Sequence, residues 1–310
     1  MNLLAAFLKL IRWPNLFFIA LTQLLFQFCI YHQLFQGFIP ANDDFHFFQL
    51  MAASICIAAA GYIINDYFDI NIDEVNKPEK LVIDKVIHRR WAIAWHFLLS
   101  TAGIVLTILA LPFWQKWYLI VANIFCVILL WFYSAKFKKS LLTGNLVISL
   151  LTSWTILIIF FSKNMPHQGV LMVDDAPAKF FRLAILYAGF AFIISLIREA
   201  LKDMQDMPGD TRFGCRTMPI IWGVNATKVY VAVWLFVILA TLIILQVYVL
   251  QFEWWLMIAY SIPLIIFPLF ILLIQLRKAA LPREFKKLSS LTKLVMLTGI
   301  LSMGFFYYYL

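Results

Sequence analysis

The chain has 310 residues, of which 64% are hydrophobic and 13% are charged, and its formal net charge is +9. Soluble globular proteins are about 45–50% apolar and about 25% charged, so this composition excludes a water-soluble domain, a disordered chain and a disulfide-rich secreted module. In a membrane protein a positive balance indicates cytoplasmic loops that face anionic lipid. We therefore expect membrane lipids, and no nucleic acid, among the partners.

The N-terminal segment, residues 1–15, is amphipathic and carries Lys9 and Arg12. It has no small-residue cleavage site of the kind that ends a signal peptide, so we expect it to lie along the membrane interface. Nine apolar runs follow it, at roughly 16–35, 45–64, 91–113, 115–133, 143–162, 178–198, 229–250, 253–276 and 289–309. The third and fourth runs are separated only by residues 113–116, which predicts a hairpin. The pattern predicts an all-α, polytopic membrane protein with nine transmembrane helices in one domain, residues 1–310.

The basic residues indicate the orientation of these spans. If the N-terminus is cytoplasmic, 21 of the 25 lysines and arginines fall on the cytoplasmic side. The other four are Lys116, Lys163, Lys179 and Arg182. This asymmetry predicts a multi-pass protein of the plasma or inner membrane whose N-terminus is cytoplasmic. The aromatic residues at 305–309 then form a belt at the outer interface.

The acidic residues are scarce and concentrated. Of the 16 in the chain, ten lie in two segments, each of which follows an apolar run on the cytoplasmic side. Each segment carries the pattern D-x2-D-x3-D, and every aspartate of the second triad lies 137 residues after its counterpart in the first. The triads are Asp66, Asp69 and Asp73, and Asp203, Asp206 and Asp210.

These spacings place three carboxylates on one face of a helix. Pro208 and Gly209 are expected to break the second helix before Asp210. Two carboxylates about 4 Å apart repel by about 4 kcal/mol at an effective dielectric constant of 20, so such a cluster favours protonation or a bound cation. The alternative is that these aspartates are solvated loop residues paired with neighbouring lysines and arginines. The occurrence of the same spacing in two segments disfavours this alternative.

Oxygen ligands without nearby histidines suit Mg²⁺, which binds carboxylates together with substrate phosphates. The five histidines are scattered and the four cysteines form no CxxC pair, so zinc and iron sites are not expected. A carboxylate cage beside an apolar interior indicates a diphosphate that carries a hydrophobic tail. Mg²⁺ would stabilise the departing diphosphate, and an aromatic-rich, water-poor pocket would surround the allylic cation.

The two segments resemble the motifs of a known family. NDYFDINID, residues 65–73, is similar to the first aspartate motif of the UbiA superfamily of intramembrane prenyltransferases, and KDMQDMPGD, residues 202–210, is similar to its second. The likeness extends to residues 12–15, to residues 133–145 with their three lysines, and to residues 214–219. It thus covers most of the chain.

The resemblance implies nine helices around a central cavity that opens to lipid, and a Mg²⁺-dependent transfer of a polyprenyl group to a lipid-soluble acceptor. It implies that the metal ligands are Asp66, Asp69, Asp73, Asp203, Asp206 and Asp210. The expected catalytic residues are Asp69, Asp206 and Lys202. The expected contacts of the prenyl diphosphate donor and the acceptor are Asn65, Lys77, Lys138, Arg198 and Asn145. The alternative for each lysine is that it has no contact with substrate and is only one of the positive charges that cytoplasmic loops usually carry.

The sequence leaves two candidates for the acceptor substrate. The sequence around Arg198 and residues 202–210 most resembles the branch that adds a geranylgeranyl group to geranylgeranylglyceryl phosphate. However, residues 79–84 depart from the Arg-Pro pattern usual in the family, and an aromatic acceptor, 4-hydroxybenzoate or dihydroxynaphthoate, is the alternative. A second anion would call for more cations, for which Arg89, Arg90, Lys136 and Lys139 are candidates. An ion-coupled transporter is a remote alternative, because its acids usually lie near the bilayer midplane.

Overall fold

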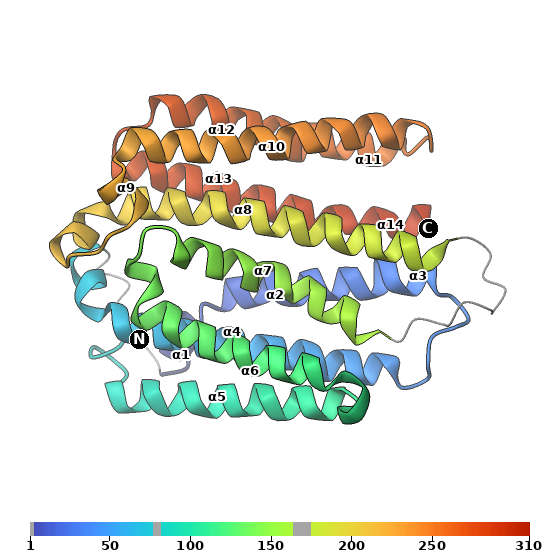
Figure 1. Ribbon diagram of the computed structural model, residues 1–310, viewed down its shortest axis with the longest axis horizontal. Helices are drawn as coiled ribbons and strands as arrows, with labels where there is room; N and C mark the ends of the chain where they lie inside the picture. Colours follow the sequence, from blue (N-terminus) through green and yellow to red (C-terminus); the bar gives the residue numbers. More distant parts are fainter. Residues whose placement is uncertain (1–2, 77–81, 164–174) are drawn as a thin grey trace.

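The computed structural model describes residues 3–76, 82–163 and 175–310, so the predicted contact Lys77 lies outside the described residues. Within them, nine helices are long and apolar enough to cross a membrane. They lie side by side along one common direction (Figure 1). The all-α, nine-span prediction is therefore confirmed.

The spans begin and end close to the predicted runs. They are α2 continued by η1 and α3 (Trp13–Leu34), α4 (Asp43–Asn76), α5 (Arg89–Ala110), α6 (Phe113–Ala135), α7 (Thr143–Ser162), α8 (Ala176–Arg212), α10 (Val224–Leu250), α11 to α12 (Trp255–Lys278) and α13 to α14 (Pro282–Tyr309). Short helices connect or precede them: α1 (Leu3–Leu10), η3 (Phe137–Lys139) and α9 (Met218–Ile221). The predicted hairpin joins α5 to α6, and it turns at residues 111–112, slightly earlier than expected.

Two helices are much longer than their apolar runs. α4 has 34 residues and α8 has 37, which at 1.5 Å per residue is about 50 Å or more, against about 30 Å for the hydrocarbon of a bilayer. Both therefore extend beyond the hydrocarbon as helices. The aspartate triads lie on these extensions, so each triad lies on a rigid element.

The expected helix break at Pro208 is wrong. α8 continues through Pro208 to Arg212, so Asp210 lies on the same helix as Asp203 and Asp206. Proline removes one intrahelical hydrogen bond. Here the side chain of Asn76, the last residue of α4, bonds backbone groups on both sides of the proline, which compensates for part of this loss.

The long helices pack in two groups around the site. α4 packs against α5 and α6, while α8 packs against α7, α10 and α13. α1 lies against α4 and α5, with Ala6 and Leu10 buried beside Ile63 and Ala92. The N-terminus and the C-terminus lie at opposite ends of the bundle (Figure 1), as an odd number of crossings requires.

Candidate active site

A cavity of about 880 Å³ lies between the two groups of helices, at the end of the bundle that carries the triads. α1, α2, α4, α6, α7, α8 and α13 all contribute to its lining. Every predicted site residue that the structure describes lines it: Asn65, Asp66, Asp69, Asp73, Lys138, Asn145, Arg198, Lys202, Asp203, Asp206 and Asp210. Segments that are far apart in sequence thus meet in one place.

Asp69 is the most deeply buried carboxylate of the two triads, with 1% of its surface exposed. The amide nitrogen of Asn65, one helical turn earlier, donates a hydrogen bond to its Oδ2 at 2.9 Å, and the ammonium of Lys138 contacts the same oxygen. The Oδ1 atoms of Asp69 and of Asn65 are buried and have no hydrogen-bond partner within the described residues. Two acceptor oxygens are therefore left for a cation.

Lys138 reaches Asp69 from η3, between α6 and α7. Gly144 allows this, because a Cβ at that position would lie 2.8 Å from the backbone oxygen of Phe137 and 3.0 Å from Cα of Lys138. Burial is the largest single effect and disfavours the charged ammonium, but Asp69, Tyr133 and Asp73 together outweigh it, so the pKa of Lys138 is raised above its usual range. Lys138 is thus a fixed cation at the first triad.

Arg12 supplies a second cation that the sequence reading did not assign to the site. Its Nη2 lies 2.5 Å from Oδ1 of Asp66, and its guanidinium lies over the ring of Tyr62, 5.3 Å from the centroid. Burial is the largest single effect and lowers the pKa of Arg12, but Asp66, Tyr62 and Asp69 together outweigh it, so this pKa is raised. Arg12 has φ of 51°, a left-handed conformation uncommon outside glycine. The conformation occurs where the chain turns from α1 into α2, at a residue that contacts the site.

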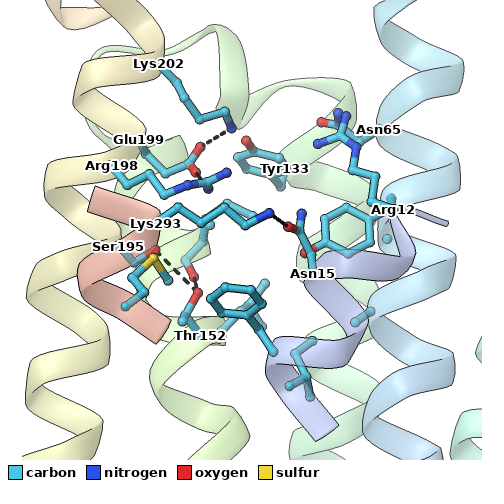
Figure 2. Close-up of a pocket in the computed structure, with 18 of the residues that line it drawn as sticks. Arg12, Asn15, Asn65, Tyr133, Thr152, Ser195, Arg198, Glu199, Lys202 and Lys293 are labelled. Carbon is cyan, nitrogen blue, oxygen red and sulfur yellow. Dashed lines mark hydrogen bonds and ion pairs between the residues drawn. The ribbon is translucent and has the colours of Figure 1, made fainter. Parts of the chain in front are cut away.

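On α8, the buried carboxylate of Glu199 binds two of the predicted site residues, although Glu199 itself was not predicted to belong to the site. Glu199 is 6% exposed, and it accepts hydrogen bonds from Arg198 at 3.0 Å and from Lys202 at 2.8 Å (Figure 2). Lys202 was expected to be a catalytic residue, and in the structure its ammonium is bonded to Glu199. The trio carries a net charge of +1. Asn145, from α7, donates to Asp203 at 3.0 Å.

Asn76 joins the two motif helices. Its amide nitrogen donates to the backbone oxygen of Asp206 at 3.0 Å, and its Oδ1 accepts the backbone N–H of Gly209 at 2.9 Å. A Cβ at position 209 would lie 2.5 Å from the Asn76 amide, so glycine is required for this approach. Their positions in the sequence could have indicated this pair, since Asn76 follows Asp73 by three residues and Gly209 directly precedes Asp210.

The six aspartates surround the cavity without forming one compact cluster. In residues 3–76, 82–163 and 175–310, only His32, Asp43 and Asp44, at the opposite end of the bundle, bring three metal-ligand atoms within 4.8 Å of one another. The donors at the triads are all oxygens, and Oδ1 of Asp69, like Oδ1 of the neighbouring Asn65, is buried without a hydrogen-bond partner among the described residues. Such a set fits a hard divalent cation that shares its coordination with a phosphate-bearing ligand.

Comparison with known families decides the class of protein. Residues 34–295 match the UbiA prenyltransferase family, which is most of the chain. The chain belongs to the UbiA prenyltransferase family. It is therefore an enzyme of the prenyltransferase class, and the transporter alternative is set aside.

Several relatives within the UbiA family share one name. The chain is 32% identical over 230 residues to digeranylgeranylglyceryl phosphate synthase of Methanospirillum hungatei, an alignment that covers 74% of this chain and 72% of that protein. It is 31% identical over 178 residues to the protein of the same name from Methanoregula boonei, covering 57% of each chain.

Solved structures show the same fold. One, from a study of digeranylgeranylglyceryl phosphate synthase in membranes, has a TM-score of 0.60 and 23% identity, covering 98% of this chain and 99% of that one. Another, a UbiA homologue from Archaeoglobus fulgidus bound to DMAPP and Mg²⁺, has a TM-score of 0.54 and 15% identity, covering 96% and 98%. Both span essentially the whole chain, so its architecture is that of UbiA membrane structures.

Proposed function

We propose that this UbiA enzyme transfers a geranylgeranyl group from its diphosphate to the glycerol hydroxyl of geranylgeranylglyceryl phosphate, with Mg²⁺ as cofactor. The observation that carries the reaction class is the single cavity onto which both aspartate triads open. The choice of donor and acceptor is supported by the relatives named digeranylgeranylglyceryl phosphate synthase, which are about 30% identical to this chain. The Mg²⁺ assignment is supported by the oxygen-only donor set and by the homologue that binds Mg²⁺.

The reaction breaks the bond between C1 of the prenyl chain and the diphosphate oxygen, and the bonding electrons leave with diphosphate. A new bond forms between C1 and the acceptor hydroxyl oxygen, whose proton is released. Mg²⁺, held by the six aspartates, would neutralise the charge that develops on diphosphate.

The protein's own cations would assist at fixed positions. Lys138 forms an ion pair with Asp69, and Arg12 forms one with Asp66. Each cation can therefore donate a hydrogen bond to a diphosphate oxygen that lies beside its partner carboxylate. Lys202, anchored by Glu199, serves the same role from α8. These groups bind and orient the leaving group before the bond breaks, so little reorganisation is needed in the transition state.

The remaining wall of the cavity suits a prenyl chain. Away from the triads it is lined by apolar side chains such as Leu151, Ile156 and Ile194. Hydroxyls that occur there are bonded to the protein, as Thr152 is to the backbone oxygen of Ile148 at 2.8 Å. Tyr133, on α6, is 8% exposed and lines the same cavity, where an aromatic face can stabilise positive charge on carbon. The walls would also limit access of water to the allylic carbon.

We also propose that the triads face the cytoplasm, as the distribution of lysines and arginines predicts. The C-terminus lies at the end of the bundle away from the triads (Figure 1). A reporter enzyme that works only outside the cytoplasm should therefore be active when fused after Leu310. Activity of such a reporter only when it is fused at the N-terminus would reverse the proposed orientation.

The acceptor assignment can be tested directly. Purified protein in lipid vesicles is incubated with Mg²⁺, labelled geranylgeranyl diphosphate and one acceptor at a time, and the lipid products are separated and identified by mass spectrometry. We expect the label in a glycerol phosphate that carries two prenyl chains. Labelling of 4-hydroxybenzoate or dihydroxynaphthoate alone would overturn the acceptor assignment.

A further inference from the structure

One face of α13 changes character along the cavity. Near the triads it presents polar side chains to the cavity, and further along the helix it presents apolar ones. The polar residues are Lys286, Ser289, Ser290 and Lys293. The others are Met296, Gly299, Ile300 and, in the turn directly after α13, Met303. Their spacings of three and four keep them on one side of the helix. This amphiphilic stripe has no role in the proposed handling of diphosphate.

Lys293 is held in position at the centre of the stripe. Its ammonium donates to Oδ1 of Asn15 at 3.0 Å and lies over the ring of Phe18, 5.2 Å from the centroid. Both partners are on α2, so Lys293 links α13 to α2. We call the part of the cavity between these two helices the α2–α13 seam. Figure 2 shows the Lys293 side chain crossing the cavity to Asn15, below Arg198 and Glu199 in that view.

The neighbouring part of α8 is also cationic. Arg198 and Lys202 share the one carboxylate of Glu199, so this group retains a net positive charge beside Lys293. Lys286, two turns before Lys293 on the stripe, is exposed and lines the cavity. An anion at the α2–α13 seam would therefore meet cations from two helices, apart from the Lys138–Asp69 and Arg12–Asp66 pairs.

We infer that the seam between α2 and α13 is the acceptor site, where Lys293 and Lys286 bind the phosphate of a single-chain glycerol phosphate lipid. The inference rests on the proposed function and adds the residues that select its acceptor. The lipid chain lies along Met296, Ile300 and Met303, which extend the stripe by about 15 Å beyond Lys293 at 1.5 Å per residue. A small aromatic acid would leave this apolar length unused. The head group at Lys293 holds the glycerol hydroxyl at the level of the triads, where C1 of the donor is released.

The test compares Michaelis constants for the two substrates. Lys293→Gln and Lys286→Gln are measured in vesicles beside Lys287→Gln, a control on the same helix whose side chain is exposed and is not among the described residues that line the cavity. We expect the KM for geranylgeranylglyceryl phosphate to rise at least tenfold in Lys293→Gln, or about 1.4 kcal/mol, while the KM for the donor changes less than twofold. Lys286→Gln should show a smaller rise of the same kind, and Lys293→Arg should recover most of the affinity.

The outcomes separate the site from the function. If wild-type protein uses the glycerol phosphate lipid but Lys293→Gln keeps its acceptor KM, or raises both KM values equally, the acceptor site is wrong and the proposed function stands. If wild-type protein prenylates only aromatic acids, both are wrong. Lys286→Gln changes an exposed side chain, so it gives a folded variant with the same readout if Lys293→Gln fails to fold.

Discussion

The amide of Asn76 and the backbone of Gly209 form the contact that ties the end of α4 to α8, with the Gly209 N–H donating to Oδ1 of Asn76 at 2.9 Å. The same amide donates to the backbone oxygen of Asp206. One side chain therefore sets the spacing between two helices that each carry a triad. It also bonds the backbone on both sides of Pro208, where α8 lacks a hydrogen bond of its own.

Replacing Asn76 should loosen the site. Asn76→Ala removes two hydrogen bonds, each worth about 0.5–1.5 kcal/mol, and misplaces Asp206 relative to the first triad. We expect at least a tenfold lower kcat with a small fall in Tm, because the triads act together. Asn42→Ala, at an exposed residue before α4, is the control. A normal kcat in Asn76→Ala would show that the contact does not position the triads.

Gly209 offers an independent test of the same contact. Alanine normally stabilises a helix relative to glycine by about 1 kcal/mol, but at position 209 its Cβ would lie 2.5 Å from the Asn76 amide. Gly209→Ala should therefore lower both Tm and kcat. Gly189→Ala is the matched control on α8, because a Cβ there meets nothing within 4 Å. Equal behaviour of the two variants in thermal melts and rate measurements would count against the close approach.

Lys138 should matter for activity more than its neighbour. Lys138→Gln removes the cation on Asp69, and we expect kcat to fall about 100-fold, since a charge-assisted contact to diphosphate is lost with it. Lys136→Gln is the control, because Lys136 is exposed on the same loop and does not belong to the described cavity lining. Initial rates of diphosphate release provide the measurement. A similar loss in both variants would indicate that only the general charge of the loop matters.

Removal of divalent cations should abolish the reaction. With EDTA in excess we expect no diphosphate release, and Mg²⁺ should restore it because the ligands are oxygens. Mg²⁺ together with geranylgeranyl diphosphate should raise Tm by mass action, and Mg²⁺ alone should raise it less. Undiminished turnover in EDTA would exclude the proposed role of the triads.

A pH-dependent test of stability concerns the opposite end of the bundle. Lys163 is buried there, with its ammonium 2.7 Å from Oδ2 of Asp43 and near Asp44, His32 and Tyr31. Asp43→Asn leaves a buried charge without its partner, which should cost about 3 kcal/mol and lower Tm without changing KM. Asp84→Asn is the control, since its pair with Arg89 is exposed and worth less than about 1 kcal/mol.

The sign of the pH effect follows from the pKa of Lys163. Burial lowers this pKa below its ordinary value of 10.5, and Asp43 opposes only part of that effect. Folding therefore favours the neutral amine, and the cost of burying the charged form disappears as pH rises toward 10.5. The Tm deficit of Asp43→Asn should be largest near neutral pH and should shrink as pH rises. A constant deficit up to pH 10 would contradict this assignment.

The sequence predicted the features that depend on local pattern. Apolar length predicted the nine spans, and the registered triads predicted which helix ends meet at the cavity. It did not predict that α8 passes through Pro208, because the compensating amide belongs to Asn76, 132 residues earlier. Arg12 and Lys293 were missed as site residues for the same physical reason. Arg12 reaches Asp66 from the turn between α1 and α2, and Lys293 reaches the cavity from α13, so only tertiary packing brings them to the site.

The central claim is that the two triads form one Mg²⁺-dependent diphosphate site, and single-turnover release of diphosphate tests it most directly. The rate is measured for wild-type protein, Asp69→Asn, Asp206→Asn and the double variant, each shown to be folded by its melting curve. We predict that either single substitution lowers the rate by at least about a thousandfold and that the double variant is no slower, because the residues act as a unit. Wild-type release by a folded Asp69→Asn variant would contradict the claim.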